Sequence, residues 1–569
     1  MSELAGVSSP IELKKKTLAA LIEAASQRFR QNPAVSMALE KPLTYSEFFA
    51  QIVVIADTLV KKGIVKGDKI AILGENSPNW GIAYMASVRI GAVVIPILTD
   101  FPEADIRHIL DDSEAKILFT TQKQVEKIAG SEHRHLQQVI MLDDFVADTE
   151  YFSVEPFSKF IQKAVGFILH IPKRLGLISQ LVQEDDLASI IYTSGTSGHS
   201  KAVMLTHGNF VANVLAANQL RVFRSDWTFL SILPLSHAYE FTLGFLLPLL
   251  NGARVVYIGK APTPSILEKV CQVEKPQVIA AVPLIMEKVY KKKVQSALEK
   301  KVLLRWAFKV PALRRGIAHA ISRKLIHFFG GRLQLMAIGG AAINHETEKF
   351  LRESGFPYLI GYGLTESAPL ICGGPWGDAT IAVGSTGKPV PGVEIRIADP
   401  DPRSGIGEIM ARGANIMKGY YKNPNLTRDT IDAQGWLRTG DLGYFDERGN
   451  LHICGRSKNM ILMSNGENIY PEAIEDLFNS QVIVVESLVV EREGRLEAMV
   501  YMDYELIDAE TRGKSEPQRL EYIQALLEQI RKTVNPHLPS FAQISRMVEH
   551  NEPFEKTATQ KIKRYLYIH

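Results

Sequence analysis

In the first part of the chain, apolar runs typical of buried strands alternate with segments in which apolar residues recur at helical spacing. An apolar run at residues 67–74 is followed by a helical pattern at residues 79–89 and by a second apolar run at residues 91–97. A strand, a helix and a strand at this spacing are typical of the βαβ unit of a parallel sheet that helices cover on both faces. The pattern therefore predicts a large α/β domain. Further apolar runs predict strands at residues 115–120, 138–142, 188–192, 253–258 and 278–282.

The two ends of the chain have different patterns. Residues 14–62 alternate helical patterns with a short turn at Asn32-Pro33. From about residue 384, glycine and proline become frequent, and short β-rich segments predict a small antiparallel sheet or barrel. After residue 458, helical patterns alternate with predicted strands, which indicates an α+β domain of about 110 residues.

Two segments combine helical spacing of apolar residues with many basic residues. The first is residues 157–168, and the second is residues 287–332, which contain thirteen Lys or Arg against two Glu although the whole chain carries only +3. A basic amphipathic helix can lie on an anionic membrane surface. The alternative is a surface helix that packs on the core and leaves its lysines in water. The apolar stripe of the second segment consists of Ile317, Ile321, Leu325 and Phe328.

Composition narrows the class of protein. A chain of 569 residues exceeds what one hydrophobic core fills, so two or more domains are expected. The small net charge gives no reason to expect nucleic acid as a partner. The cysteines Cys271, Cys372 and Cys454 are too far apart in sequence to suggest a metal site or a disulfide framework. No secretory signal and no apolar run of about 20 residues is visible, so we expect a cytoplasmic protein.

Residues 190–201 form the stretch most suggestive of chemistry. A β-branched run leads into small hydroxylated residues and two glycines and ends at Lys201. Glycine lets backbone N–H groups turn toward an anion, hydroxyls add donors, and the lysine supplies a point charge suited to phosphate. The stretch is not a Walker loop, because Ser200 precedes the lysine and Ala202 follows it. The stretch predicts a binding site for the triphosphate of a nucleotide, and the alternative interpretation is a flexible surface turn.

Four further clusters have residue types suited to a nucleotide site. Small residues at 339–342 follow a predicted strand and would let a planar group lie against the backbone. Glu366 ends a tight turn, and a lone carboxylate near phosphates is a natural anchor for Mg²⁺. Asp441 can accept hydrogen bonds from both ribose hydroxyls, with Arg456 close behind it in sequence, and residues 556–564 form a basic loop. Each cluster alone is a common turn or solvated tail, so only their joint occurrence indicates a nucleotide site.

In this combination and order, the motifs resemble those of the adenylate-forming (AMP-binding) superfamily, which includes acyl-CoA synthetases, peptide-synthetase adenylation domains and luciferases. The similarity runs from about Leu43 to Arg564. Residues 233–240, residues 282–288 and the basic insert after Lys288 look most like the long-chain fatty acyl-CoA synthetase branch.

The resemblance implies a fold and a reaction. The expected fold is α/β, with an N-terminal AMP-binding domain at residues 1–457 that contains two doubly wound mixed sheets plus a small β-barrel at about residues 384–457. A mobile α+β C-terminal lid domain would follow at residues 458–569. The implied reaction joins ATP and a medium- or long-chain fatty acid to give acyl-AMP and pyrophosphate, after which coenzyme A displaces AMP, with Mg²⁺ as cofactor. Acyl carrier protein is the alternative acceptor, and a non-catalytic nucleotide- or lipid-binding, membrane-associated protein is the alternative from another class.

The resemblance also implies residue roles. Lys561, His237 and Thr365 would be catalytic, Glu366 would bind Mg²⁺, and Lys458 would be the hinge about which the lid rotates. The expected ATP- and AMP-binding residues are Thr193, Ser194, Gly195, Thr196, Ser197, Gly198, Lys201, Gly339, Gly340, Ala341, Gly361, Tyr362, Gly363, Thr365, Asp441 and Arg456.

The chain departs from the usual family pattern at four positions. Lys458 stands at the pivot in place of aspartate, which is a known alternative in the family. Ser200 stands where proline commonly precedes the lysine, Ala202 stands where glycine follows it, and Gln560 replaces the glycine before the catalytic lysine. None of these changes removes a charge that the chemistry requires. The resemblance therefore implies an active enzyme. We expect this enzyme to be cytoplasmic, and peripheral contact with the inner face of the membrane is a further interpretation.

Overall fold

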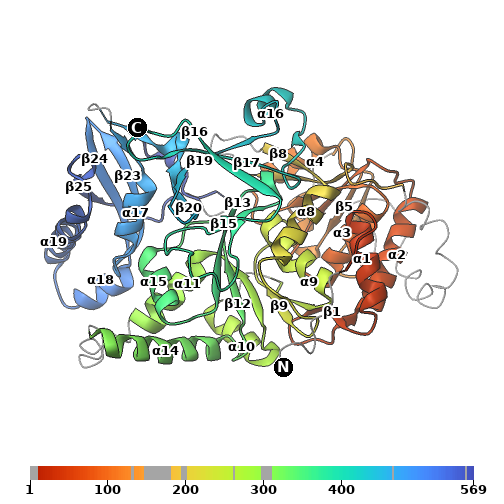
Figure 1. The fold of residues 1–569 in the computed structure, drawn as a ribbon, viewed down its shortest axis with the longest axis horizontal. Coiled ribbons are helices and arrows are strands. Elements are labelled where there is room, and N and C mark those ends of the chain that lie inside the picture. The colour runs from red at the N-terminus through yellow and green to blue at the C-terminus, as the bar shows by residue number, and fades with distance from the viewer. Residues whose placement is uncertain are drawn as a thin grey trace.

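The computed structural model describes residues 11–129, 133–145, 181–193, 201–259, 263–295, 310–463, 467–557 and 561–568. The predicted phosphate-loop residues Ser194 to Gly198 and the basic segment 157–168 lie outside the described residues. The chain builds two large mixed sheets flanked by helices, then a small antiparallel sheet, and then a group of strands and helices on one side of the molecule (Figure 1).

A seven-stranded sheet contains the βαβ unit that the apolar pattern predicts. Its strands follow the order β18-β8-β7-β4-β3-β5-β6. The strands β6, β5, β3, β4 and β7 are parallel, and β8 and β18 join antiparallel at one edge. The bounds are β3 (Lys69–Leu73), β4 (Val93–Ile97), β5 (Ile117–Thr120), β6 (Gln138–Met141), β7 (Leu187–Thr193), β8 (Lys201–Thr206) and β18 (Gly419–Tyr420).

A nine-stranded sheet in the order β15-β14-β13-β12-β11-β9-β10-β1-β2 forms the second layer. The prediction of a turn between helices at Asn32-Pro33 was incomplete, because Pro33 begins a strand that pairs in parallel with β10. A proline is tolerated as the first residue of a strand, and the buried run after it is too short to show a period. The bounds are β1 (Pro33–Met37), β2 (Leu43–Thr44), β9 (Thr228–Ser231), β10 (Arg254–Tyr257), β11 (Val278–Ala281), β12 (Leu335–Ile338), β13 (Tyr358–Gly363), β14 (Leu370–Gly373) and β15 (Lys388–Pro389).

Helices cover both sheets, and side-chain caps fix where several of them begin. Thr44 and Glu47 form a capping box on α2, and Thr206 and Asn209 form one on α8. The α-helices of this part are α1 (Leu18–Arg28), α2 (Tyr45–Lys61), α3 (Pro78–Arg89), α4 (Glu103–Ser113), α5 (Gln122–Val125), α8 (His207–Asn218), α9 (Leu247–Asn251), α10 (Pro264–Glu274), α11 (Pro283–Val289), α14 (Pro311–Phe328), α15 (His345–Glu353) and α16 (Pro424–Thr430). Two π-helical segments are η1 (Glu240–Leu246) and η2 (Tyr290–Gln295), and the 3₁₀ turns are η3 (Thr365–Ser367) and η4 (Ser457–Asn459).

The predicted small barrel is an open sheet. Its four strands follow the order β16-β17-β19-β20, and all neighbours are antiparallel. Closure would require β16 to pair with β20, and within the described ranges each of these two strands pairs with only one neighbour in this sheet. The bounds are β16 (Val393–Ala398), β17 (Gly407–Gly413), β19 (Leu437–Phe445) and β20 (Leu451–Arg456).

The remaining elements have the predicted α+β character. We call them the C-terminal lobe, and we call the elements from α1 to β20 the large lobe. A three-stranded sheet, β23-β24-β25, packs against helices, and β21 pairs with β22. The bounds are β21 (Ile461–Leu462), β22 (Asn468–Ile469), α17 (Pro471–Asn479), β23 (Val484–Arg492), β24 (Arg495–Met502), α18 (Tyr504–Glu510), α19 (Glu516–Val534), η5 (Asn535–His537), η6 (Ser540–Ala542), β25 (Ile544–Glu549) and η7 (Arg564–Leu566).

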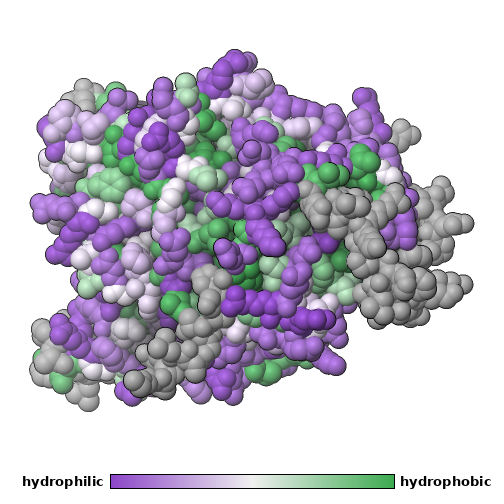
Figure 2. Space-filling view, turned by 45° about the vertical axis from the view of Figure 1, so that its right-hand side comes forward, coloured by the Kyte–Doolittle hydropathy of each residue, from purple (hydrophilic) through white to green (hydrophobic). Residues whose placement is uncertain are grey.

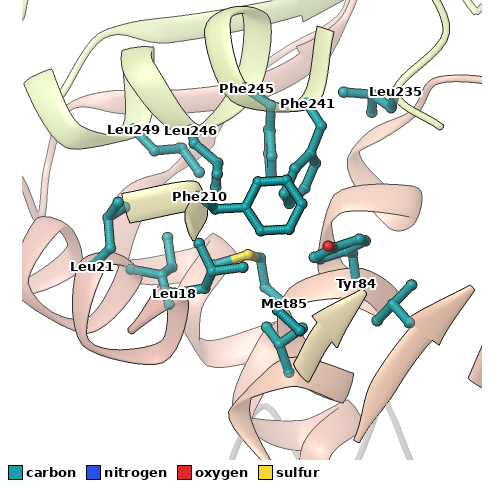
Figure 3. Close-up of a cluster of buried hydrophobic side chains, with 14 of the residues drawn as sticks. Leu18, Leu21, Tyr84, Met85, Phe210, Leu235, Phe241, Phe245, Leu246 and Leu249 are labelled. Atoms are coloured by element: carbon teal, nitrogen blue, oxygen red, sulfur yellow. The ribbon is translucent and has the colours of Figure 1, made fainter. Parts of the chain in front are cut away.

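An aromatic cluster joins the helices of the large lobe to one another. The ring of Phe241 on η1 lies 5.1 Å from that of Phe210 on α8 and 4.1 Å from that of Tyr84 on α3. Figure 3 shows these rings converging with Met85 and with apolar side chains of α1, η1 and α9. The first large helices and the segment that follows His237 therefore share one core.

The two lobes have separate hydrophobic cores. Phe478 and its neighbours belong to a cluster whose members all lie in the C-terminal lobe, whereas Phe210 belongs to a cluster confined to the large lobe. Among the described residues, no buried hydrophobic cluster contains residues of both lobes. Among these residues, burial of apolar side chains in a common core therefore does not hold the two lobes together.

Separate cores predict separate thermal transitions. Phe210→Ala should lower the stability of the large lobe by about 3–5 kcal/mol, because it leaves a cavity beside a fully buried ring. Phe478→Ala should have an effect of similar size on the C-terminal lobe alone. Differential scanning calorimetry of both variants should show different transitions moving. A shift of the same transition in both variants would contradict separate cores.

Candidate active site

A carboxylate, a guanidinium and a phenol meet where the nine-stranded sheet approaches the small antiparallel sheet. Asp441 on β19 and Arg456 on β20 are register partners, and Arg456 Nε lies 3.1 Å from Asp441 Oδ1. The Tyr362 hydroxyl on β13 donates to Asp441 Oδ2 over 2.7 Å. Burial raises the pKa of Tyr362 well above its ordinary value, so the phenol remains a hydrogen-bond donor. The carboxylate is therefore held in one orientation from two sides.

Glu366 lies in a turn that buried amides hold in place. The turn η3 follows β13, and Glu366 Oε1 accepts a hydrogen bond of 2.8 Å from the Tyr420 hydroxyl. Asn213 on α8 donates to Leu370 O over 2.7 Å, and Asn415 donates to Ser367 O over 2.9 Å. Backbone groups of an irregular turn need such partners when they are buried. Sequence reasoning missed Tyr420, Asn213 and Asn415.

A sequence signal for one of these residues exists. Asn209 and Asn213 are spaced by four in an otherwise apolar stretch of α8, which places both amides on one face of the helix. Asn209 donates to Ala414 O and Ile416 O, each over 2.8 Å. Amides at this spacing in an apolar helix indicate that the helix supports irregular backbone.

Lys201 brings a cation next to Glu366. It begins β8 opposite Thr193 on β7, so the two ends of the predicted phosphate loop are adjacent. Its ammonium lies 5.2 Å from the centre of the Tyr420 ring. Burial lowers the pKa of Lys201, the charge of Glu366 raises it, and the charges of Lys458 and Arg456 lower it. The ends of the loop thus reach the same site as Asp441 and Glu366.

The small residues after β12 lie against the strand that carries Tyr362. A Cβ on Gly339 would come within 3.2 Å of Gly361 O. Gly340 has φ of 86°, which only glycine adopts readily, and Ala341 is exposed beside it. Tyr239 fixes this strand by donating from its hydroxyl to Ala337 O over 2.9 Å. The result is an accessible shelf of backbone.

His237 is a neutral imidazole at pH 7. It precedes η1, in a turn where its backbone N–H donates to Pro234 O over 3.0 Å. Burial lowers the pKa of His237 to about 4, with the charge of Asp100 opposing this shift and that of Lys561 adding to it. His237 can therefore donate or accept a hydrogen bond without adding charge.

Lys561 is the one predicted site residue on the C-terminal lobe that the structure places at this site. Its backbone N–H donates to Thr557 Oγ1 over 3.2 Å. Burial lowers the pKa of Lys561 most strongly, the charge of Arg456 lowers it further, and the charges of Asp441 and Glu366 raise it. The residue is nevertheless exposed to solvent. We use the word cleft for the region between the lobes in which the charges of Lys561, Asp441, Arg456 and Glu366 interact.

Most of the predicted residues that the structure describes come together around this cleft. Tyr362, Asp441, Arg456, Glu366, Lys201 and Lys561 are connected by contacts or by their charges. Thr365 is the neighbour of Glu366 in η3, and Lys458 lies in η4, between the last strand of the large lobe and the first strand of the C-terminal lobe. Cations and accessible backbone on one side of a carboxylate suit a ligand with both hydroxyl and phosphate groups.

The chain is similar to known proteins over most of its length. The model of the family "AMP-binding enzyme" matches residues 22–421, and that of the "AMP-binding enzyme C-terminal domain" matches residues 458–568. Fatty acyl-CoA synthetase A of Dictyostelium discoideum is 30% identical over 74% of this chain and 66% of its own length. The long-chain-fatty-acid–CoA ligase FadD15 of Mycobacterium bovis is 28% identical over 92% of this chain and 90% of its own.

Solved structures show the same fold. The O-succinylbenzoate coenzyme A synthetase MenE of Bacillus subtilis in complex with AMP superposes with a TM-score of 0.70, at 22% identity over 98% of both chains. ATP-bound MatB of Rhodopseudomonas palustris superposes with a TM-score of 0.73, at 22% identity over 97% of this chain and 98% of its own.

The hairpin that carries Tyr362 requires glycine at position 363. A Cβ on Gly363 would lie 1.8 Å from Pro369 O, so Gly363→Ala should destabilise the large lobe by about 2–4 kcal/mol. Gly316 on α14 is the matched control, because its added Cβ meets nothing within 4 Å. Gly316→Ala should stabilise by about 0.5–1 kcal/mol through helix propensity. Urea denaturation of both variants tests this, and similar midpoints would contradict the close approach at Gly363.

Proposed function

Because the chain belongs to the AMP-binding enzyme family and is an adenylate-forming CoA ligase, we propose that its acid substrate is a medium- or long-chain fatty acid. In the first step a carboxylate oxygen attacks the α-phosphorus of ATP, and pyrophosphate leaves. In the second step the thiol of coenzyme A loses its proton, its sulfur attacks the acyl carbon, and AMP leaves. The products are acyl-CoA, AMP and pyrophosphate.

The first step brings together two anions, so it requires cations and exact placement. The observation that carries the proposal is that Lys561, although it belongs to the C-terminal lobe, lies near enough to Asp441, Arg456 and Glu366 of the large lobe for their charges to shift its pKa. We assign to Lys561 the contact with both the acyl carboxylate and the α-phosphate. Neutral His237 would donate a hydrogen bond beside the same carboxylate.

The nucleotide would lie along the residues of the large lobe. Asp441, which Tyr362 and Arg456 hold from two sides, would accept hydrogen bonds from ribose hydroxyls. Tyr362 and the shelf at Gly339–Ala341 would bracket the adenine, with the close-packed backbone at Gly361 and Gly363 behind it. The β- and γ-phosphates would lie against Lys201 and the loop from Thr193 to Gly198.

Glu366 fits a magnesium site of the kind found with nucleotides. Mg²⁺ takes few protein ligands and completes its shell with phosphate oxygens and water. The Tyr420 hydroxyl orients this carboxylate, and Thr365 supplies a hydroxyl at the neighbouring position. We therefore propose that Mg²⁺ binds at Glu366 and neutralises phosphate charge there.

The preference for fatty acids is supported by the names of the relatives, among them a fatty acyl-CoA synthetase and a long-chain-fatty-acid–CoA ligase. The structural neighbour MenE is named as an O-succinylbenzoate coenzyme A synthetase, so we expect the pocket, and not the fold, to select the acid. Two alternatives make different predictions. Transfer to acyl carrier protein would require that protein instead of coenzyme A, and a non-catalytic binding protein would release no AMP.

The direct test combines the purified protein with ATP, Mg²⁺ and a chain-length series of fatty acids. We expect AMP release with coenzyme A that rises toward medium or long chains. AMP release only with acyl carrier protein, or only with short or aromatic acids, would contradict the proposal.

Lys561→Ala should reduce acyl-adenylate formation by about 100- to 1,000-fold while leaving thiolysis of supplied acyl-adenylate largely intact, because its charge is needed in the first step. Equal losses in both steps would remove Lys561 from that role.

We also propose that the protein is cytoplasmic and contacts anionic membranes through charge. The apolar stripe of α14 faces inward, since Leu325 and Phe328 are buried in a core cluster and Ile321 packs against it. The exposed face carries Arg315, Arg323 and Lys324. Figure 2 shows a mainly hydrophilic face of the molecule. In the described part of the chain, no helix has the length and apolarity needed to span a bilayer.

Vesicle sedimentation tests this contact. Binding to vesicles that contain phosphatidylglycerol should weaken as salt rises from 50 to 500 mM, because exposed charges are screened beyond ~10 Å at 0.1 M. R323E/K324E should weaken binding further, whereas Leu313→Ala, on an exposed apolar residue of the same helix, should not. Salt-insensitive binding would indicate apolar insertion by another segment.

A further inference from the structure

Several polar contacts between the lobes are made by helix α17, which also lies against β20. An exposed ion pair of Arg403 with Glu467 joins the lobes elsewhere. In Figure 1, α17 of the C-terminal lobe lies next to α15 and α11 of the large lobe. Two of the contacts with α17 are made by Lys291 on η2 and by Asn344 and His345 at the start of α15. An interface without a shared hydrophobic core does not hold two lobes rigidly, so individual hydrogen bonds decide how they sit.

Lys291 caps the C-terminal end of α17. Its ammonium donates to Asn479 O over 3.0 Å and to Val484 O over 3.1 Å. Asn479 is the last residue of the helix, where backbone carbonyls lack partners within the helix and the dipole is negative. A lysine from one lobe thus satisfies carbonyl groups of the other.

In the second contact the charged group is an anion, and it comes from the C-terminal lobe. Asn344 is the N-cap of α15, and its side-chain amide donates to Asp476 Oδ1 of α17 over 3.1 Å. The N–H of His345 donates to Asp476 Oδ2 over 3.5 Å. A carboxylate from the C-terminal lobe therefore meets the positive end of a helix in the large lobe. Glu287 supports this contact by accepting from the N–H of Asn344 over 2.8 Å.

Helix α17 also holds the segment that carries Lys561. The guanidinium of Arg564, three residues after Lys561, forms an ion pair with buried Glu475 of α17. Arg564 also donates to Val489 O over 3.4 Å, on the strand that packs against α17. Helix α17 therefore contacts the large lobe through some of its residues and the segment that carries Lys561 through others.

We propose that Lys291 and Asn344 form an interlobe clamp on α17 and act as positioning residues that place Lys561 for acyl-adenylate formation. This proposal rests on the proposed function. Without the clamp the lobes remain folded, because each has its own core, but Lys561 spends less time at the nucleotide site. Loss of the clamp should therefore lower the rate of the first step and leave nucleotide binding by the large lobe unchanged.

The main test is Lys291→Met in the full-length enzyme. We expect the kcat of acyl-adenylate formation, measured by ATP–pyrophosphate exchange, to fall about tenfold, with the KM for ATP changed less than about twofold, because hydrogen bonds to charged donors are among the stronger ones. Lys288→Met is the matched control, since Lys288 is an exposed lysine one turn earlier in the chain. Arg403→Ala is a second control, because Arg403 pairs with Glu467 across the lobes over 3.4 Å but is 76% exposed. Unchanged exchange in Lys291→Met, or equal losses in the controls, would overturn the clamp.

A double-mutant cycle tests whether Lys291 acts through Lys561. In a Lys561→Ala background, Lys291→Met should cause no further loss of exchange, since there is no ammonium left to position. A further tenfold loss in that background would show that Lys291 affects the reaction by another route and would overturn the proposal. Asn344→Ala should behave as Lys291→Met does, in both backgrounds.

A distance measurement separates failure of the clamp from failure of the proposed function. Spin labels at Val65→Cys in the large lobe and Leu520→Cys in the C-terminal lobe use positions that are 60% and 47% exposed. We expect a narrow interlobe distance distribution in the parent protein and a broader one in Lys291→Met, whether or not any fatty acid is activated. Identical distributions would overturn the clamp, whereas a broadened distribution in an enzyme that activates no fatty acid would overturn only the proposed function.

Discussion

The arrangement of the site depends on a polar interface between two lobes that have separate hydrophobic cores. The charge of Lys561 interacts with those of Asp441, Arg456 and Glu366 only because the C-terminal lobe sits where it does, and no shared apolar core fixes that position among the described residues. Hydrophobic burial is strong and non-directional, whereas hydrogen bonds across an interface are directional and individually modest. A lobe held in this way can be placed accurately and still be released.

Charge at the cleft is distributed so that anionic reactants are favoured without a large excess of positive charge in the resting protein. Lys201 and Lys561 both have lowered pKa values because burial disfavours their charged forms, while the carboxylate of Glu366 opposes this effect for both. His237 adds no charge at neutral pH. Bound phosphates and a carboxylate would stabilise the ammonium groups in turn, so the ligand and the lysines support one another.

Rigid parts of the large lobe support this cleft. The aromatic cluster of Phe210, Phe241 and Tyr84 fixes the helices beside the segment that carries His237 (Figure 3). Buried amides of α8 and of the segment near Asn415 hold the turn with Glu366. Precise positioning of reactive groups requires such support, since errors of about 1 Å can cost 100-fold in rate.

The sequence by itself determined the fold class, most strand and helix positions and the identity of the charged residues at the cleft. Apolar periodicity and the order of the glycine-rich motifs are local in the chain, so they can be recognised without a structure. The short strand at Pro33 was not predicted, and the residue pattern left open whether the small antiparallel sheet closes into a barrel, because pairing partners distant in sequence decide both. Only the tertiary structure showed that the apolar stripe of α14 faces inward, that Tyr420 orients Glu366, and that Lys291 caps α17. These contacts join segments far apart in the chain, and no local pattern records which distant group a side chain will meet.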